Sequence, residues 1–154
     1  MKVQRTEDRL VVYLGKRETH LLLEVLKLYP CIPPAHHQLS RVTQLPNSAE
    51  TQRLLDEALA EQRAENKRLL QALLQDPGRT RRLETGWQLA LSPGDAEWLL
   101  QILNDIRVGS WLLLGAPEDK LPVEPLNKAT APHFWAMELS GHFQMHLLQA
   151  MTEG

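Results

Sequence analysis

Three residues near the C-terminal end of the chain have types and spacing that suit a metal site. Glu138, His142 and His146 follow one another at intervals of four residues, which in a helix places them along one face. Two histidines one turn apart can bind a single zinc ion, and a carboxylate is a common further ligand. The HExxH sequence of zinc hydrolases is absent, because the residues between the histidines are Phe-Gln-Met. Two interpretations stay open, a metal-binding face and an ordinary polar face.

Other residues with reactive side chains are scattered. His36 and His37 lie in a proline-rich stretch and His133 begins the last predicted helix; they could join such a site, although nothing in their spacing requires it. Cys31 is interpreted as a small packed residue, and a single cysteine cannot form an intrachain disulfide. The sequence contains no Walker loop, dinucleotide-binding glycine motif or nucleophile elbow. We therefore favour a non-enzymatic protein, with a metal ion as the one cofactor to consider.

The helix that would position Glu138 and the histidines starts near Pro132 and runs almost to the C-terminus. Its apolar residues are expected to form a buried stripe opposite the histidines, made of Met137, Gly141, Leu148 and Met151.

The best-specified helix starts at residue 93. Ser92 is a good N-cap, Pro93 suits the first helical position, and Asp95 favours the positive end of the helix dipole. A strand over 87–91 precedes it, with alternating apolar residues. The helix should run over 93–114 and form the centre of the fold.

The rest of the chain adds three elements. A short hairpin is expected over residues 2–14, a helix from Arg17 until Pro30 stops it, and a second helix from Asn47 or Ser48 to Gln75. The second helix should pack at both ends and meet water at its polar centre. The sequence thus predicts a single domain, 1–154, of the α+β class. It is predominantly helical, with about four helices packed around helix 93–114 and a small two- or three-stranded sheet.

One internal similarity occurs at an offset of 77 residues. Residues 10–26 are predicted to form a strand that ends at Gly15 and a leucine-rich helix with an acidic residue, Glu18, near its start. Residues 87–103 repeat this order, with Ser92 at the position of Gly15 and Asp95 at the position of Glu18. The two units could pack as a pair with their strands side by side, although any two strand-to-helix units look alike.

The second half of helix 93–114 is apolar on nearly every face. Val108, Trp111 and Leu112 continue the side that begins as polar, so they need a cover, either from this domain or from a partner. Gly109 and Ser110 are small enough to admit a close neighbour. Val108, Trp111 and Leu112 are therefore the candidate interaction residues.

A polar group interrupts the same helix. Asn104, Asp105 and Arg107 border its apolar face, where a buried charge needs a partner. They suit a structural network that joins the helix to a neighbour; a functional constellation is the alternative.

Residues 91–115, LSPGDAEWLLQILNDIRVGSWLLLG, resemble an uncharacterised bacterial family of unknown function, DUF2017. In that family a strand leads into a helix that carries Trp-Leu and then Leu-Asn-Asp-Leu-Arg. The matching residues here are Trp98, Leu99, Leu103, Asn104, Asp105, Ile106 and Arg107, with Ile106 in place of leucine. The resemblance implies a small, mostly helical bacterial cytosolic protein. Since the family has no established activity, no catalytic residue is carried over.

The charge and the apolar runs of the sequence limit the classes of partner that we expect. The chain has 17 basic and 19 acidic residues and a formal charge of −2, which does not suit a nucleic-acid partner. The basic run Arg79-Thr80-Arg81-Arg82 is assigned to helix-end electrostatics and solubility. No membrane span or leader is apparent, so we expect a cytoplasmic protein. The favoured function is a protein-interaction or regulatory module, with a homodimer as one form. The alternative is a metal-binding protein or metal-dependent hydrolase that uses Glu138, His142 and His146.

Overall fold

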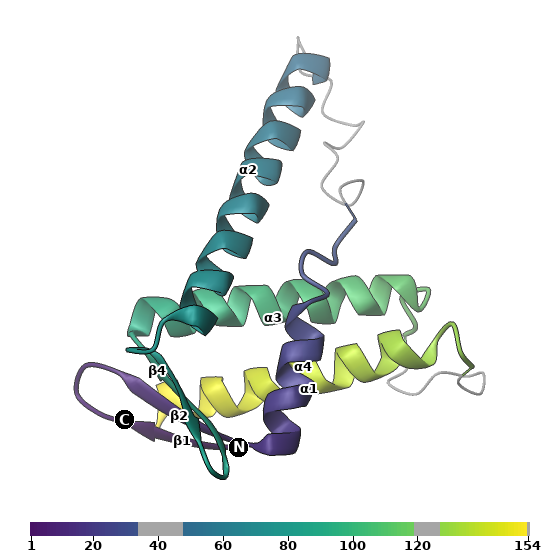
Figure 1. The fold of residues 1–154 in the computed structure, drawn as a ribbon. Helices are drawn as coiled ribbons and strands as arrows, with labels where there is room; N and C mark the ends of the chain where they lie inside the picture. The colour runs from purple at the N-terminus through teal and green to yellow at the C-terminus, as the bar shows by residue number, and fades with distance from the viewer. Residues whose placement is uncertain (34–47, 119–126, 154) are drawn as a thin grey trace.

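A computed structural model of the chain describes residues 1–33, 48–118 and 127–153 (Figure 1). These residues form an α+β fold that is mostly helical, as the sequence predicts. Its elements follow in the order β1 (Lys2–Arg5), β2 (Leu10–Gly15), α1 (Lys16–Leu26), α2 (Ser48–Gln75), β3 (Thr80–Leu83), β4 (Gly86–Leu91), α3 (Pro93–Leu113) and α4 (Ala131–Thr152).

The sheet has four antiparallel strands in the order β1-β2-β4-β3, so the prediction of two or three strands was wrong. The missed strand is β3, which pairs with β4 from Thr80 opposite Leu89 to Leu83 opposite Gly86. It lies at the edge of the sheet, and Arg81 and Arg82 are exposed. An edge strand with one apolar residue has no alternating pattern to recognise.

The two similar units do lie side by side. β2 pairs with β4 in an antiparallel register that places Leu10 opposite Leu91 and Leu14 opposite Trp87. Leu91 is the residue 77 positions after Leu14, and Trp87 is the residue 77 positions after Leu10. Leu10 thus pairs with the counterpart of Leu14, and Leu14 pairs with the counterpart of Leu10. A local two-fold axis between the two strands produces this relation.

The likeness extends beyond these strands to the other described elements. Each half runs hairpin, helix, helix: β1, β2, α1 and α2 in the first half, and β3, β4, α3 and α4 in the second. The last residues of α2 and α4, Gln75 and Thr152, are again 77 positions apart. The fold is therefore two ββαα halves, and we call residues 77 positions apart counterparts.

The core lies between one face of the sheet and helices α1, α3 and α4. The predicted cap of α3 is confirmed: the Ser92 hydroxyl accepts a hydrogen bond from the Asp95 N–H at 3.1 Å, and the Asp95 carboxylate accepts one from the Ser92 N–H at 3.2 Å. Counterparts at the start of α1 repeat half of this arrangement, since the Gly15 N–H donates to the Glu18 carboxylate at 3.0 Å. The central helix contributes the buried residues Ala96, Leu99, Ile102, Leu103, Ile106, Gly109 and Ser110.

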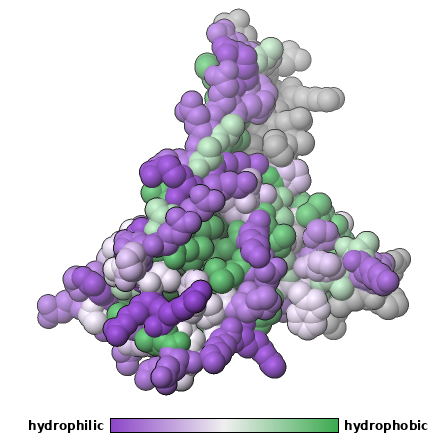
Figure 2. Space-filling model, in the orientation of Figure 1, coloured by the Kyte–Doolittle hydropathy of each residue, from purple (hydrophilic) through white to green (hydrophobic). Residues whose placement is uncertain are grey.

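Helix α2 does not pack as expected. Its C-terminal end is buried at Leu70 and Leu73, but Leu54 near its start is 53% exposed. Figure 1 shows this half of α2 extending away from α3 and α4. In Figure 2 the projecting half is mainly hydrophilic, while apolar surface gathers between the lower part of α2 and α1. A groove of about 590 Å³ lies there, with Leu23 and Leu74 among its lining residues. The predicted cap at Asn47 lies outside the described residues.

Candidate functional site

The outer face of α4 is the most unusual exposed surface of the described residues. Trp135, Met145 and Leu148 are 56%, 55% and 49% exposed, and Glu138 and His142 are exposed beside them. We use the name outer face of α4 for these five residues. Because α4 has a single Asp, Glu, Lys or Arg, Glu138, in its 22 residues, this face is mainly apolar although it meets solvent.

The opposite side of α4 packs on the core. Its buried stripe has the helical spacing of a core face, but it is not the predicted stripe of Met137, Gly141, Leu148 and Met151. Leu148 is exposed, and Met137, Gly141 and Met151 are half-buried. The buried residues of α4 are Ala136, Ser140, Phe143 and Leu147.

Helix α3 contributes one exposed aromatic side chain next to this face. Among the candidate interaction residues, Val108 and Leu112 are half-buried, whereas Trp111 is 37% exposed. The indole N–H of Trp111 donates to the Pro117 carbonyl at 3.0 Å. A groove of about 620 Å³ between α3 and α4 is lined by Trp111 together with Arg107, Pro117, Glu118, Met137, Glu138, Gly141, His142 and Met145. Trp111 thus extends the outer face of α4 onto α3.

The structure brings the two histidines of the candidate metal site together. The ring centroids of His142 and His146 are 4.5 Å apart, with the ring planes at 75°. Glu138 is exposed one turn earlier. It lies eight residues from His146, which along a helix axis is roughly 12 Å. Within the described ranges, no group of three or more His, Cys, Asp or Glu side chains is placed to hold a metal ion. His36 and His37 lie outside these ranges.

His146 also faces charged groups from the N-terminal part of the chain. Burial, the neighbouring His142 and the Met1 ammonium lower the pKa of His146, while Glu18 opposes the shift. The Glu18 carboxylate accepts a hydrogen bond from the Met1 ammonium. Burial alone would raise the pKa of Glu18, but hydrogen bonds from this ammonium and from the Gly15 N–H lower it. Both shifts favour a neutral imidazole beside an ionised carboxylate near neutral pH.

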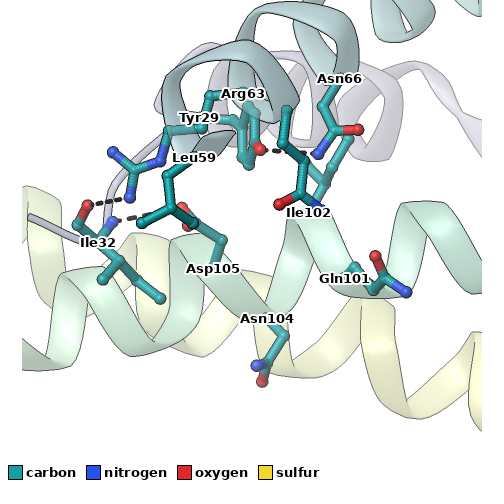
Figure 3. Close-up of a pocket in the computed structure, with 10 residues that line it drawn as sticks. Tyr29, Ile32, Leu59, Arg63, Asn66, Gln101, Ile102, Asn104 and Asp105 are labelled. Atoms are coloured by element: carbon teal, nitrogen blue, oxygen red, sulfur yellow. Dashed lines mark hydrogen bonds between the residues drawn. The ribbon is translucent and has the colours of Figure 1, made fainter. Parts of the chain in front are cut away.

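A second polar group surrounds residues 29–32, which cross over α3 (Figure 3). The Asp105 carboxylate accepts hydrogen bonds from the N–H groups of Cys31 at 2.6 Å and Ile32 at 3.3 Å. The Arg63 guanidinium of α2 donates to the Ile32 carbonyl at 2.7 Å. Ile32, Arg63 and Asp105 border a small pocket of about 190 Å³. Their polar atoms are engaged with the backbone, so the arrangement fastens the segment to the helices.

The predicted trio of Asn104, Asp105 and Arg107 is divided between two surroundings. Asp105 binds the 31–32 backbone, whereas Arg107 donates to the Asn104 side chain at 3.1 Å on the exposed side of the same helix. Figure 3 shows Asp105 directed towards Ile32 and Asn104 directed away from it.

The small residues of α3 admit the same segment. A Cβ atom on Gly109 would lie 2.5 Å from the Cys31 carbonyl carbon, closer than two carbons can approach. The Cys31 sulfur is 3.8 Å from the Ser110 hydroxyl, and burial raises the pKa of the Cys31 thiol. Cys31 is therefore a packed residue, and residues around it supply part of the cover that α3 requires.

Sequence reasoning missed the role of the centre of α2. The Asn66 side chain donates to the Tyr29 hydroxyl at 2.9 Å and accepts from the Trp98 indole N–H at 3.0 Å. Asn66 and Arg63 looked solvent-facing because they are polar. Their spacing with the buried Leu70 and Leu73, at 63, 66, 70 and 73, is nevertheless that of an inward helix face.

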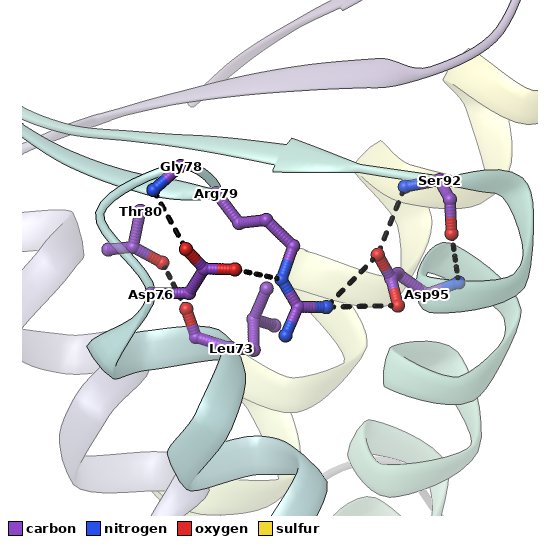
Figure 4. Close-up of polar contacts among 7 residues, drawn as sticks. All are labelled: Leu73, Asp76, Gly78, Arg79, Thr80, Ser92 and Asp95. Carbon is purple, nitrogen blue, oxygen red and sulfur yellow. Dashed lines mark hydrogen bonds and ion pairs between the residues drawn. The ribbon is translucent and has the colours of Figure 1, made fainter.

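The basic run at 79–82 also has a specific contact (Figure 4). Arg79 donates to the Asp76 carboxylate at 3.1 Å and to the Asp95 carboxylate at 3.4 Å. It therefore connects the end of α2 to the beginning of α3.

Comparison with known protein families, curated proteins and solved structures gives no match. The resemblance of residues 91–115 to DUF2017 therefore stays a prediction. Among the helices of the described residues, none is long and apolar enough to span a membrane.

Proposed function

We propose that this protein is an interaction module that pairs with a second copy of itself through the outer face of α4. The observation that carries the proposal is the exposure of Trp135, Met145 and Leu148 on a helix with one charged residue. Several large apolar side chains exposed on one helix typically mark an interaction site. Trp111, one of the interaction residues expected from the sequence, enlarges it.

The distribution of residues along α4 favours a second copy as the partner. His142 lies near the middle of α4, with Trp135 towards one end and Leu148 towards the other. In an antiparallel pair centred on His142, Trp135 of each copy lies opposite Gln149 of the other, the residue after Leu148. Glu138, the one carboxylate of α4, then faces His146 of the second copy. A surface that complements itself in this way suits a two-fold dimer.

Metal binding is the second candidate function. It is favoured by the adjacent rings of His142 and His146, 4.5 Å between centroids, because two imidazoles at this helical spacing can bind one ion. Hydrolysis would need a catalytic base in addition, for which Glu138 is the nearest candidate on the same helix.

The pairing is tested by measuring molar mass with multi-angle light scattering over a range of protein concentrations. We expect dimers for the unaltered chain and monomers for Trp135→Arg, because a guanidinium would be buried against an apolar partner. Leu54→Arg on α2 is the matched control, since Leu54 is 53% exposed against 56% for Trp135. A monomeric unaltered chain at the highest concentration, or equal effects of both substitutions, would contradict the proposal.

A further inference from the structure

We infer that the outer face of α4 carries half-sites for zinc, each completed by the second copy. His142 and His146 of one copy supply two ligands, and Glu138 of the second copy supplies the third. The inference rests on the proposed pairing and names a metal that strengthens it.

A single chain supplies only two of these ligands. His142 and His146 are one turn apart and their rings are adjacent. Glu138 precedes His142 by one turn and His146 by two turns, so its distance from His146 along the helix axis is roughly 12 Å. Ligand atoms about 2 Å from a zinc ion cannot include both ends of that span. This agrees with the lack of a three-residue metal group in the described part of the chain.

Antiparallel pairing changes the partner of each histidine. A two-fold axis at position 142 relates the two helices. A residue that precedes His142 by four positions in one helix therefore lies opposite the residue that follows His142 by four positions in the other helix. Glu138 of the second copy therefore faces His146. Packed helix axes are about 8–10 Å apart, a gap that a glutamate and an imidazole side chain can bridge from opposite sides. Two equivalent sites result, one on each side of the axis.

The surroundings of the histidines suit metal binding. His146 is half-buried, and its ring packs edge-on against the exposed ring of His142. Glu18 on α1 faces the same pair and is itself bound to the Met1 ammonium. Arg107 on α3 lines the groove with Glu138 and His142. Two imidazoles and one carboxylate form a ligand set that zinc accepts, with water in the fourth position.

The first experiment compares sedimentation of the full chain in EDTA and in added Zn²⁺, with the zinc content measured by elemental analysis. We expect zinc to tighten dimerisation at least about tenfold and to bind at one ion per chain. The double substitution of His142 and His146 to alanine, and Glu138→Gln, should each remove the zinc effect. The matched control is His20→Ala, since His20 is an exposed histidine on α1; it should keep the effect.

The second experiment tests whether the ligands come from two copies. Neither Glu138→Gln nor the double histidine variant should form a zinc-dependent dimer alone. A mixture of the two should, because the histidines of the first can meet Glu138 of the second in one intact site. The mixed dimer should hold one zinc ion. Failure of the mixture to dimerise with zinc would overturn the shared site.

The outcomes separate the two proposals. Dimers in EDTA that zinc does not strengthen would keep the pairing and remove the metal site. Monomers with and without zinc would remove both. Zinc bound at one ion per chain without dimerisation would place the whole site in one copy and overturn the inference.

Discussion

Helices α2 and α4 occupy the same place in the two ββαα halves but differ in chemistry. α2 has nine Asp, Glu, Lys and Arg residues among 28, whereas α4 has one among 22. α4 lies against α3 in the core, and the first half of α2 extends away from it (Figure 1). A repeated order of elements therefore does not produce a repeated mode of packing.

The difference can be followed along their inward faces. The inward faces of α2 and α4 consist of residues 77 positions apart, and each face includes a buried leucine, Leu70 in α2 and Leu147 in α4. One turn towards the N-terminus on the inward face, α2 has Asn66, which donates and accepts hydrogen bonds. At the same place α4 has Phe143, which is 2% exposed. The comparison teaches that α2 adds polar contacts with a crossing segment to its buried leucines, whereas the inward face of α4 relies on apolar burial.

The largest effect should come from removing the apolar anchor of α4. Phe143→Ala should lower the free energy of unfolding by about 3–5 kcal/mol, because it leaves a cavity in the core. Urea unfolding followed by circular dichroism measures this. A loss below about 1 kcal/mol would place Phe143 outside the cooperative core and break the comparison.

Two helical glycines offer the next test. Gly109→Ala should cost about 1–3 kcal/mol, because the new Cβ would overlap the Cys31 backbone. Gly141→Ala is the matched control on α4. Its Cβ would meet the Arg107 Cδ at an ordinary 3.6 Å, so the gain in helix propensity, up to about 1 kcal/mol, should stabilise the fold. Equal losses at both positions would argue against close packing of residues 29–32 on α3.

Removing the polar anchor of α2 should have a smaller effect on stability. Asn66→Ala deprives the Tyr29 hydroxyl and the Trp98 indole of their partner, at a cost of about 1–2 kcal/mol. Hydrogen exchange should show faster exchange in α2 than in the unaltered chain, with α4 unchanged. Exchange that rises equally in both helices would mean that α2 and α4 unfold together.

The smallest effect concerns His146, whose counterpart on α2 is Leu69. Because the pKa of His146 is lowered in the folded chain, the unfolded chain binds more protons as the pH falls below about 6.5. Stability should therefore decrease from about pH 7.5 to about pH 5.5, and less so in His146→Gln. Urea unfolding at both values measures the difference. An identical pH dependence in both chains would show that His146 does not contribute.

The sequence predicted the elements whose signals are local. Ser92 and Asp95 place the start of α3, and the offset of 77 residues anticipates the pairing of β2 with β4. It could not predict β3, because two of its four residues are exposed arginines at a sheet edge. It also chose the wrong buried stripe in α4, because a helix with one charged residue has no periodic contrast between its faces.

The candidate site was predictable only in part for a related reason. His142 and His146 meet because helical spacing alone brings them together. Asn104 and Asp105 separate because consecutive residues of a helix point in different directions. The partner of Asp105, the backbone of residues 31–32, lies more than 70 positions away, and no local pattern reveals such a contact.

The charges at the two sheet edges limit how copies of this chain can associate. β1 contains Lys2 and Arg5, β3 contains Arg81 and Arg82, and neither strand contains an acidic residue. Two copies that approached edge to edge would bring like charges together along short strands, which disfavours a continuous sheet between molecules. The charges thus disfavour fibre-like growth at both edges, and the proposed pairing uses the helical side of the molecule instead.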